Sequence, residues 1–197
     1  DEKGQIFVVD AKSENIEIVK LTTVDKTRQY SEVICKNLKA EVLENSSDSV
    51  EPIKQAIDAG RIMLAADSLG ASQVMIDKAV DYAKERKQFG RAIGSFQAVK
   101  HMCAEMAADI EPCYALVWHA AHCHDHSPDE ARLMACHAKA HVSEISKGIA
   151  KKATEVHGGM GFTDLLGLHY WFKRIGLNRQ ILGSPELVRE EAYRTQA

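Results

Sequence analysis

The pattern of apolar and polar residues changes once along the chain. In the N-terminal part, branched residues gather in residues 6–9 and 16–21, and Ile16 and Ile18 alternate with polar neighbours. This alternation is typical of a half-buried strand. Beyond the polar run at residues 46–49, apolar residues recur at the three- and four-residue spacing of a buried helix face. The sequence therefore predicts a β region followed by a helical region.

We place the boundary at that polar run, with a β region over residues 1–48 and a helical domain over residues 49–197. Four main helices are predicted, at about residues 52–86, 95–121, 127–156 and 165–182, and a short fifth helix follows with Ser184 as its cap. Four main helices joined by short connections indicate a helical bundle.

Local signals add detail to the predicted helices. Pro112 predicts a kink in the second helix, and Ser127 with Glu130 predicts a capping box at the start of the third. Gly60 and Gly70 lie inside the first helix, where each costs about 1 kcal/mol relative to alanine. We therefore expect other parts of the protein to pack closely against both glycines.

Composition is that of an ordinary globular protein, with 45% hydrophobic and 27% charged residues among 197. The net charge of −3 gives no basic surface for nucleic acid or for an anionic membrane. No apolar run approaches the roughly 18 residues needed to span a bilayer. The five cysteines are odd in number and form no C-x-x-C pair, which favours reduced thiols. We expect a cytoplasmic protein, or a mitochondrial matrix protein in a eukaryote.

Two segments carry candidate chemistry. His157–Thr163 contains three glycines within four residues, which lets the backbone bend sharply or approach a ligand closely. The upstream segment Tyr82–Gly90 reads Tyr-Ala-Lys-Glu-Arg-Lys-Gln-Phe-Gly and is followed by Ile93 and by Phe96–Gln97. Together the two segments resemble the C-terminal half of the acyl-CoA dehydrogenase family, whose members are flavoenzymes.

The resemblance covers nearly the whole chain. It implies a mainly α fold, with a four-helix-bundle C-terminal domain of acyl-CoA dehydrogenase type preceded by a remnant of a β-barrel or β-sandwich domain. Ile6–Asp10 resembles a strand of that middle β-domain, and Asp58–Arg61 resembles the start of the helical domain. Family members carry an N-terminal helical domain and the first half of the β-domain ahead of this point. The chain is therefore expected to be a fragment or a reduced relative, inactive alone.

The resemblance also implies a set of cofactor contacts. Arg86 matches the arginine that contacts the diphosphate of the neighbouring subunit's FAD, and Phe89 and Gln97 match further contacts. Gly158 and Gly159 match the turn whose backbone lies along the adenosine part of FAD. Without the resemblance, Arg86 would be assigned to the helix C-terminal dipole, Phe89 to the core, and Gln97 to solvent.

Further positions match family sites less completely. The family commonly has glutamine where this chain has Glu155, and a carboxylate beside a diphosphate is repulsive unless it is protonated or turned away. A cofactor contact is also implied for Ser184. Asp58 and Arg61 match residues near the acyl-CoA, and the alternative is a solvent-exposed helix face.

The reaction implied by the resemblance is α,β-dehydrogenation of an acyl-CoA thioester, in which a carboxylate removes the α proton. The two positions that the family uses for this base fall on Leu182 and Gly60, and neither can accept a proton. Glu186 is a weak replacement candidate, because glutamates at helix starts usually serve the helix dipole. The alternative function is a non-catalytic partner or oligomerisation subunit of an acyl-CoA dehydrogenase complex, and either function implies a homo- or hetero-oligomer, dimeric or tetrameric.

A separate cluster of potential metal ligands lies near the end of the second predicted helix. It comprises His119, His122, Cys123, His124, Asp125 and His126. Imidazole and thiolate are ligands for zinc or copper, but the paired spacing of a structural zinc site is absent. We expect a solvated loop here and no metal site.

Overall fold

The computed structural model describes residues 5–43 and 50–196 and divides into two compact units, residues 1–57 and 58–197. The predicted boundary after residue 48, together with the polar run that suggested it, lies outside the described residues. Helix α1, Glu51–Glu85, crosses from the first unit into the second.

The first unit contains two antiparallel strand pairs. Strand β1, Phe7–Val8, pairs with β4, Glu41–Val42, and β2, Ile16–Leu21, pairs with β3, Tyr30–Cys35. The strand predicted over residues 16–21 is confirmed. The expectation of a half-buried face is wrong within this chain, because Ile18 is 66% exposed. Within residues 5–43, this two-stranded hairpin has no second layer of sheet to cover its apolar side chains.

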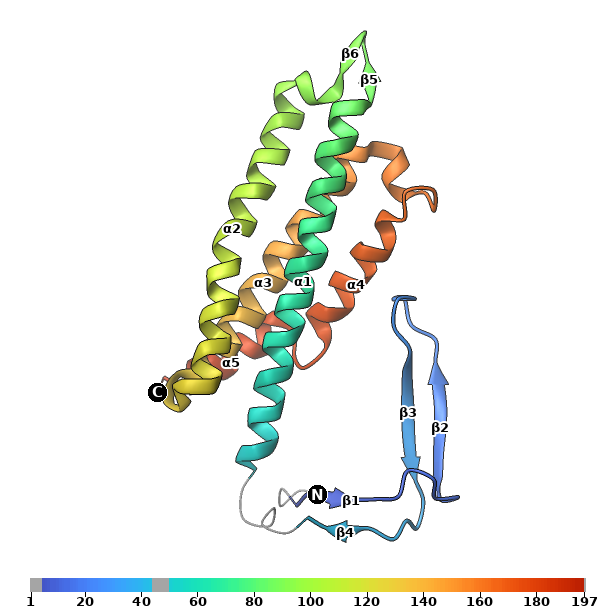
Figure 1. Ribbon diagram of the computed structural model, residues 1–197, viewed down its shortest axis with the longest axis vertical. Coiled ribbons are helices and arrows are strands. Elements are labelled where there is room, and N and C mark those ends of the chain that lie inside the picture. Colours follow the sequence, from blue (N-terminus) through green and yellow to red (C-terminus); the bar gives the residue numbers. More distant parts are fainter. Residues whose placement is uncertain (1–4, 44–49, 197) are drawn as a thin grey trace. The chain divides into compact units, whose positions relative to one another are not determined.

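The second unit is a bundle of long helices (Figure 1). The helices are α1, α2 (Gln97–His126), α3 (Pro128–His157), α4 (Leu168–Gln180) and α5 (Pro185–Arg194). Helix α3 is central, because it packs against α2, α4 and α5. A mainly α fold with a small amount of strand near the N-terminus is therefore confirmed.

Small residues bring the helix backbones close together. The fully buried residues of the core include Ala65 and Ala79 of α1 and Ala138 and Ala153 of α3, together with Met75 of α1. Alanine adds little volume at a helix contact, so neighbouring helices approach closely. The same core also contains many large aliphatic side chains from these helices.

Several helix ends differ from the predictions. Helix α2 continues through Pro112 and extends to His126 instead of ending near residue 121. The capping box at Ser127 is not formed: the Ser127 side chain makes no cap hydrogen bond, and its carbonyl oxygen accepts from the backbone N–H groups of Glu130 and Ala131. The backbone satisfies these donors without the hydroxyl.

A short hairpin that the sequence did not reveal separates α1 from α2. Strands β5 (Lys87–Gln88) and β6 (Arg91–Ala92) pair across a two-residue turn. Both turn residues have positive φ, +53° at Phe89 and +77° at Gly90. This is the combination that a type I′ turn requires, and it matches the twist of the flanking strands.

The glycine-rich segment forms a tight turn after α3, over Gly158–Phe162. Gly158 ends α3 with a φ of +59°. A Cβ on Gly161 would lie 2.9 Å from the Thr154 carbonyl oxygen, so this glycine lets the turn pack against α3. Gly159 has neither constraint: its φ is not positive, and nothing in the described structure lies within 4 Å of an added Cβ.

Close packing is confirmed at one of the two glycines inside α1. A Cβ on Gly60 would meet the Leu182 side chain, whereas one on Gly70 would meet nothing within 4 Å among the described residues. The expectation is therefore wrong for Gly70, which lies on an exposed face of α1.

We predict that Gly161→Ala destabilises the bundle by about 1–3 kcal/mol, because the added methyl group overlaps a backbone oxygen that cannot move freely. Gly159→Ala is the matched control and should change the free energy of unfolding by less than about 0.5 kcal/mol. Urea denaturation followed by circular dichroism measures both values. Equal stabilities for the two variants would contradict the packing described for Gly161.

Candidate functional site

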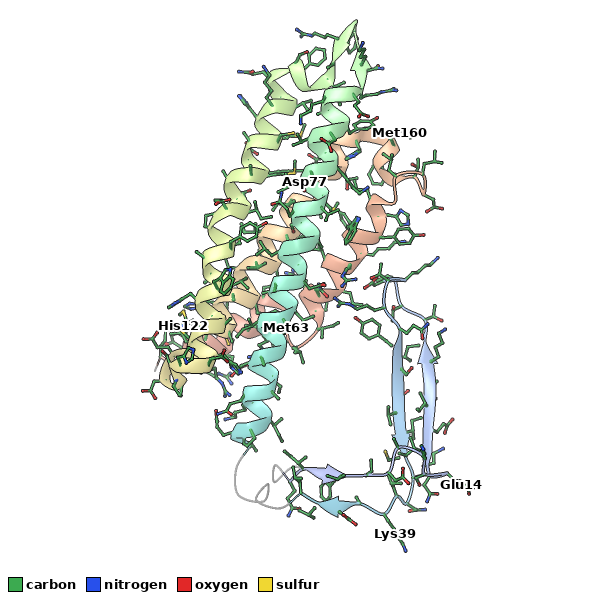
Figure 2. All side chains as sticks on the ribbon, in the orientation of Figure 1. Glu14, Lys39, Met63, Asp77, His122 and Met160 are labelled. Atoms are coloured by element: carbon green, nitrogen blue, oxygen red, sulfur yellow. The ribbon has the colours of Figure 1, made fainter. Side chains whose placement is uncertain are left out.

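One cavity brings together four of the residues assigned to cofactor binding. Arg86, Glu155, Gly158 and Gly159 line an open cavity of about 450 Å³ formed by the end of α1, strand β5, the segment after β6, the end of α3 and the glycine turn. Its remaining lining residues are Tyr82, Gln88, Ile93, Val156, His157 and Met160. Figure 2 shows Met160 toward the hairpin end of the bundle.

A pair of stacked rings supports this cavity. His157 is buried, and its ring stacks on that of Tyr82 with 4.6 Å between centroids. Its Nδ1 lies 2.7 Å from the Ala153 carbonyl oxygen, so Nδ1 carries the proton and donates it. In the neutral ring Nε2 is then the acceptor. The sequence analysis did not assign His157 to the site. Its place directly before two glycines, at the last residue of α3, is the sequence signal that could have identified it.

The donor set fits an anionic group. Arg86 is exposed, and the same segment carries Lys84, Lys87 and Arg91 against Glu85. Because no described side chain or backbone atom occupies the space in front of Gly159, the backbone there is open to a ligand. Glu155 opposes an anion, but it is exposed and has room to turn toward solvent.

Phe89 and Gln97 lie outside the cavity lining. Phe89, at the hairpin tip, is 93% exposed and meets Phe96 edge-on with 6.1 Å between ring centroids. Assignment of Phe89 to the core is therefore wrong. Gln97 begins α2 and is exposed. Their contacts with a cofactor stay predictions.

Gly60 and Leu182, the two predicted base positions, meet in space. A Cβ on Gly60 would lie 2.5 Å from Leu182 Cδ1, although the two residues belong to α1 and to the loop between α4 and α5. Leu182 has a φ of +57° and Gly183 one of +106°. A positive φ is strained for leucine. The loop therefore keeps an unusual backbone at a position that carries no proton acceptor.

A buried ionic network holds this loop. Arg61 donates from Nε to the Leu182 carbonyl oxygen at 3.0 Å and pairs through Nη2 with Glu191 at 2.6 Å. Arg61 Nη1 lies 3.4 Å from Asp58, whose other oxygen accepts from Arg132 at 3.1 Å. Burial raises the pKa of Asp58, and the Arg132 hydrogen bond opposes that rise.

Asp58 and Arg61 are buried, so their assignment to a solvent-exposed helix face is wrong. Their role near an acyl-CoA stays a prediction. Arg61 Nη1 also lies 3.4 Å from Cys136 Sγ, and burial raises the pKa of that thiol to about 11. Cys136 is thus a protonated packing residue at neutral pH.

Glu186 is poorly suited to the role of a catalytic base. Hydrogen bonds from Ser184, from its own backbone and from Arg179 lower its pKa to about 2. The Arg179 Nη2 atom lies 2.7 Å from the Glu186 carboxylate. A carboxylate that holds a proton so weakly is a poor general base for an α proton.

Lys139 holds the end of α4, directly before this loop, from inside the bundle. It is fully buried, and its Nζ donates to the carbonyl oxygens of Asn178 and Arg179 in the last turn of α4. Burial, with added repulsion from Arg61 and Arg179, lowers its pKa to about 8. The charged ammonium group therefore loses its hydration when it is buried, and the carbonyl oxygens of α4 compensate for only part of that loss.

The cavity and Gly60 lie far apart along α1. Gly60 and the helix end at Glu85 are separated by 25 residues, which corresponds to about 38 Å at 1.5 Å per residue. In Figure 2, Met63 and Met160 mark these two parts of the bundle. A ligand that touches both features of one chain would have to span about this distance.

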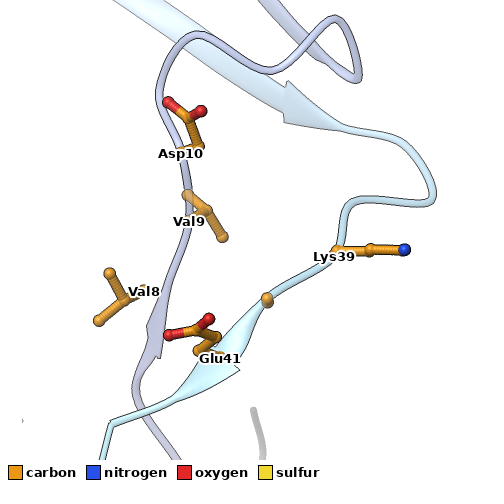
Figure 3. Close-up of a pocket in the computed structure, with 6 residues that line it drawn as sticks. Val8, Val9, Asp10, Lys39 and Glu41 are labelled. Atoms are coloured by element: carbon orange, nitrogen blue, oxygen red, sulfur yellow. The ribbon is translucent and has the colours of Figure 1, made fainter.

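Two further regions contain no residue of the predicted cofactor site. The first unit has a cavity of about 670 Å³ beside β1 and β4, lined by Val8, Val9, Asp10, Lys39, Ala40 and Glu41 (Figure 3).

The histidine-rich segment over residues 119–126 belongs entirely to α2, so the expectation of a loop is wrong. Within residues 5–43 and 50–196, we find no helix with the length and apolar character of a membrane span.

The bundle, with its arginine- and glycine-lined cavity, has the fold of the helical domain of flavoprotein oxidoreductases. Residues 50–196 match the family model described as "Acyl-CoA dehydrogenase, C-terminal domain". The chain belongs to the acyl-CoA dehydrogenase family.

Curated relatives agree with this assignment. The chain is 36% identical over 165 residues to the caffeyl-CoA reductase-Etf complex subunit CarC of Acetobacterium woodii, with 79% of this chain and 42% of that protein covered. It is 30% identical over 175 residues to acyl-CoA dehydrogenase IpdE2 of Mycolicibacterium smegmatis, with 89% and 50% covered. The chain thus spans about half the length of the curated relatives it matches.

The same fold occurs in solved structures. The butyryl-CoA dehydrogenase of Megasphaera elsdenii superposes with a TM-score of 0.91 at 22% identity, over 99% of this chain and 52% of that one. At this identity the similarity concerns the fold alone.

We predict that Lys139→Met alters the pH dependence of stability. The folded pKa of about 8 lies below the ordinary 10.5, so the unfolded chain binds more protons here between these values. The penalty for burying the charge is complete below the folded pKa and disappears above the unfolded one. The unsubstituted protein should therefore gain about 2 kcal/mol relative to Lys139→Met from near pH 7 to near pH 9.5, measured by urea unfolding. Parallel pH profiles would contradict the lowered pKa.

Proposed function

We propose that this chain is the C-terminal portion of an FAD-dependent acyl-CoA dehydrogenase that removes the α and β hydrogens of an acyl-CoA thioester. The observation that carries this proposal is the cavity in which Arg86 faces the glycine turn at Gly158 and Gly159. Family membership supplies the reaction class, because acyl-CoA dehydrogenases are flavoprotein oxidoreductases.

Each residue of the cavity has a defined task in this proposal. The Arg86 guanidinium pairs with the diphosphate of FAD, where a charged, two-pronged donor is most effective. The backbone at Gly158 and Gly159 lies along the adenosine part, and Glu155 turns to solvent. When bound, FAD supplies the acceptor for the β hydrogen.

In our proposal, Phe89 and Gln97 make further contacts with FAD outside the cavity. A phenylalanine that is 93% exposed at a hairpin tip leaves a large apolar surface in water, and contact with a cofactor or another subunit would cover it. The FAD in question belongs to a neighbouring subunit, because the base position of the same chain lies about 38 Å away along α1. This geometry favours a dimer or a tetramer.

We infer that this chain does not itself supply the usual catalytic base. Both base positions, Gly60 and Leu182, lack a proton acceptor and are in contact with each other. The nearby carboxylates of Asp58 and Glu191 pair with Arg61, and that of Glu186 pairs with Arg179. Arg61 and Asp58 hold the loop that would border the acyl-CoA, and Ser184 lies on that loop.

The same observation favours a second function, that of a non-catalytic partner subunit. Such a chain would grip the flavin of a base-bearing relative and complete its oligomer. The chain is similar to a subunit of the caffeyl-CoA reductase-Etf complex. This similarity supports a role as one subunit of a larger redox complex that acts on a CoA thioester. The free cysteines of the present chain favour a reducing compartment, which is the cytoplasm or the mitochondrial matrix of a eukaryote.

Arg86→Gln should weaken FAD binding by roughly 10- to 100-fold, because a charge-assisted hydrogen bond contributes about 1.5–3 kcal/mol. Lys84→Gln removes the same charge from the same helix end and should have a smaller effect. The ratio of flavin to protein absorbance, measured on the full-length polypeptide, gives the result. Equal flavin losses in the two variants would indicate general electrostatic attraction instead of a specific contact.

Leu182→Glu, in the full-length polypeptide, should create or raise dehydrogenase activity by restoring a carboxylate where the family has its base. Leu182→Gln is the control, because glutamine has the shape of glutamate and cannot accept the proton. Dye reduction with a series of acyl-CoA thioesters measures the activity. If Leu182→Glu keeps its flavin and gains nothing over Leu182→Gln, the partner-subunit function is favoured.

A further inference from the structure

Three potential metal ligands from two helices converge where α2 turns into α3. His119 and Cys123 are one helical turn apart on the same face of α2, and Glu130 lies in the first turn of α3. The Cys123 Sγ atom is 3.7 Å from His119 Nε2 and 3.9 Å from Glu130 Oε2. One ligand atom from each residue lies within 4.8 Å of the other two.

We propose that His119, Cys123 and Glu130 form a binding site for a divalent zinc ion, which clips the end of α2 to the start of α3. The proposal is independent of the flavin cavity. Figure 2 shows His122, in the same segment of α2, at the end of the bundle away from Met160.

The observed separations match those of a zinc site. With zinc–sulfur, zinc–nitrogen and zinc–oxygen distances of about 2.3, 2.0 and 2.1 Å, tetrahedral coordination places ligand atoms about 3.4–3.6 Å apart. The sulfur is already within a few tenths of an ångström of this spacing from both partners. Only the imidazole and the carboxylate must approach each other, by up to about 1.4 Å, and both belong to exposed residues that can rotate.

The ligand types select the ion. Thiolate and imidazole favour zinc over magnesium or calcium, which prefer sets of oxygen ligands. Binding converts the Cys123 thiol to a thiolate, with its proton released to solvent as the zinc–sulfur bond forms. Three protein ligands leave one tetrahedral position for water or for a group from another molecule.

The separate, ordinary roles of these side chains do not account for their convergence. A histidine near a helix end and a glutamate in a first turn each complement a helix dipole, but neither role places them around a buried sulfur. Burial and the adjacent Glu130 carboxylate raise the pKa of Cys123. A divalent cation would reverse this effect, because it attracts both the thiolate and the carboxylate.

The experiment uses the full chain, stripped of metal with a chelator, dialysed against zinc and then analysed by elemental mass spectrometry. Cobalt substitution adds a direct readout, since a thiolate ligand produces a charge-transfer band in the near ultraviolet. The expected result is one zinc per chain, the cobalt–thiolate band, and a rise in Tm of at least about 3 °C with zinc.

Matched variants separate this site from nonspecific binding. Cys123→Ser, His119→Gln and Glu130→Gln should each weaken zinc binding by more than about tenfold, and Cys123→Ser should remove the cobalt–thiolate band. Cys113→Ser and His122→Gln, which alter a buried cysteine and an exposed histidine of the same helix outside the trio, should bind as the unsubstituted chain does. Absence of the band in the unsubstituted chain, or zinc binding that survives both His119→Gln and Glu130→Gln, would overturn the proposal.

Discussion

The loop between α4 and α5 depends on the interactions of the buried Arg61 guanidinium. It joins α1 to the loop carbonyl of Leu182 and to Glu191 of α5. Removal of one partner from a buried ion pair typically costs about 3–5 kcal/mol, because the other charge is left uncompensated. The strained backbone at Leu182 is therefore maintained by charge. The loop thus keeps this backbone at Leu182, a residue whose side chain cannot accept a proton.

Helical periodicity was sufficient to predict the bundle, because long amphipathic segments reveal their type even when their ends are uncertain. The hairpin at Phe89–Gly90 was missed, since each strand has two residues and no alternation can develop over that length. The end of α2 was missed because the histidines after residue 121 carry no apolar signal. The absent capping box at Ser127 shows that a matching pattern does not guarantee the hydrogen bond.

The candidate site was predictable only in part. The glycine turn and Arg86 were identified from a family resemblance, and the structure brings them to one cavity. The contact between Gly60 and Leu182 needed tertiary structure, because the two residues are far apart in the sequence. Burial of Arg61 was equally hidden. A charged residue on a helix is normally exposed, and only the ion pairs with Asp58 and Glu191 explain the exception.

The length of α1 has a consequence for how many working centres an assembly contains. If this chain pairs with a base-bearing relative, the flavin gripped by its hairpin end would face the relative's carboxylate. The flavin gripped by the relative would instead face Leu182. Each such pair would then hold one competent centre and one silent one, so that substrate would bleach only half of the bound flavin. A rigid helix of 35 residues would in this way set the stoichiometry of catalysis.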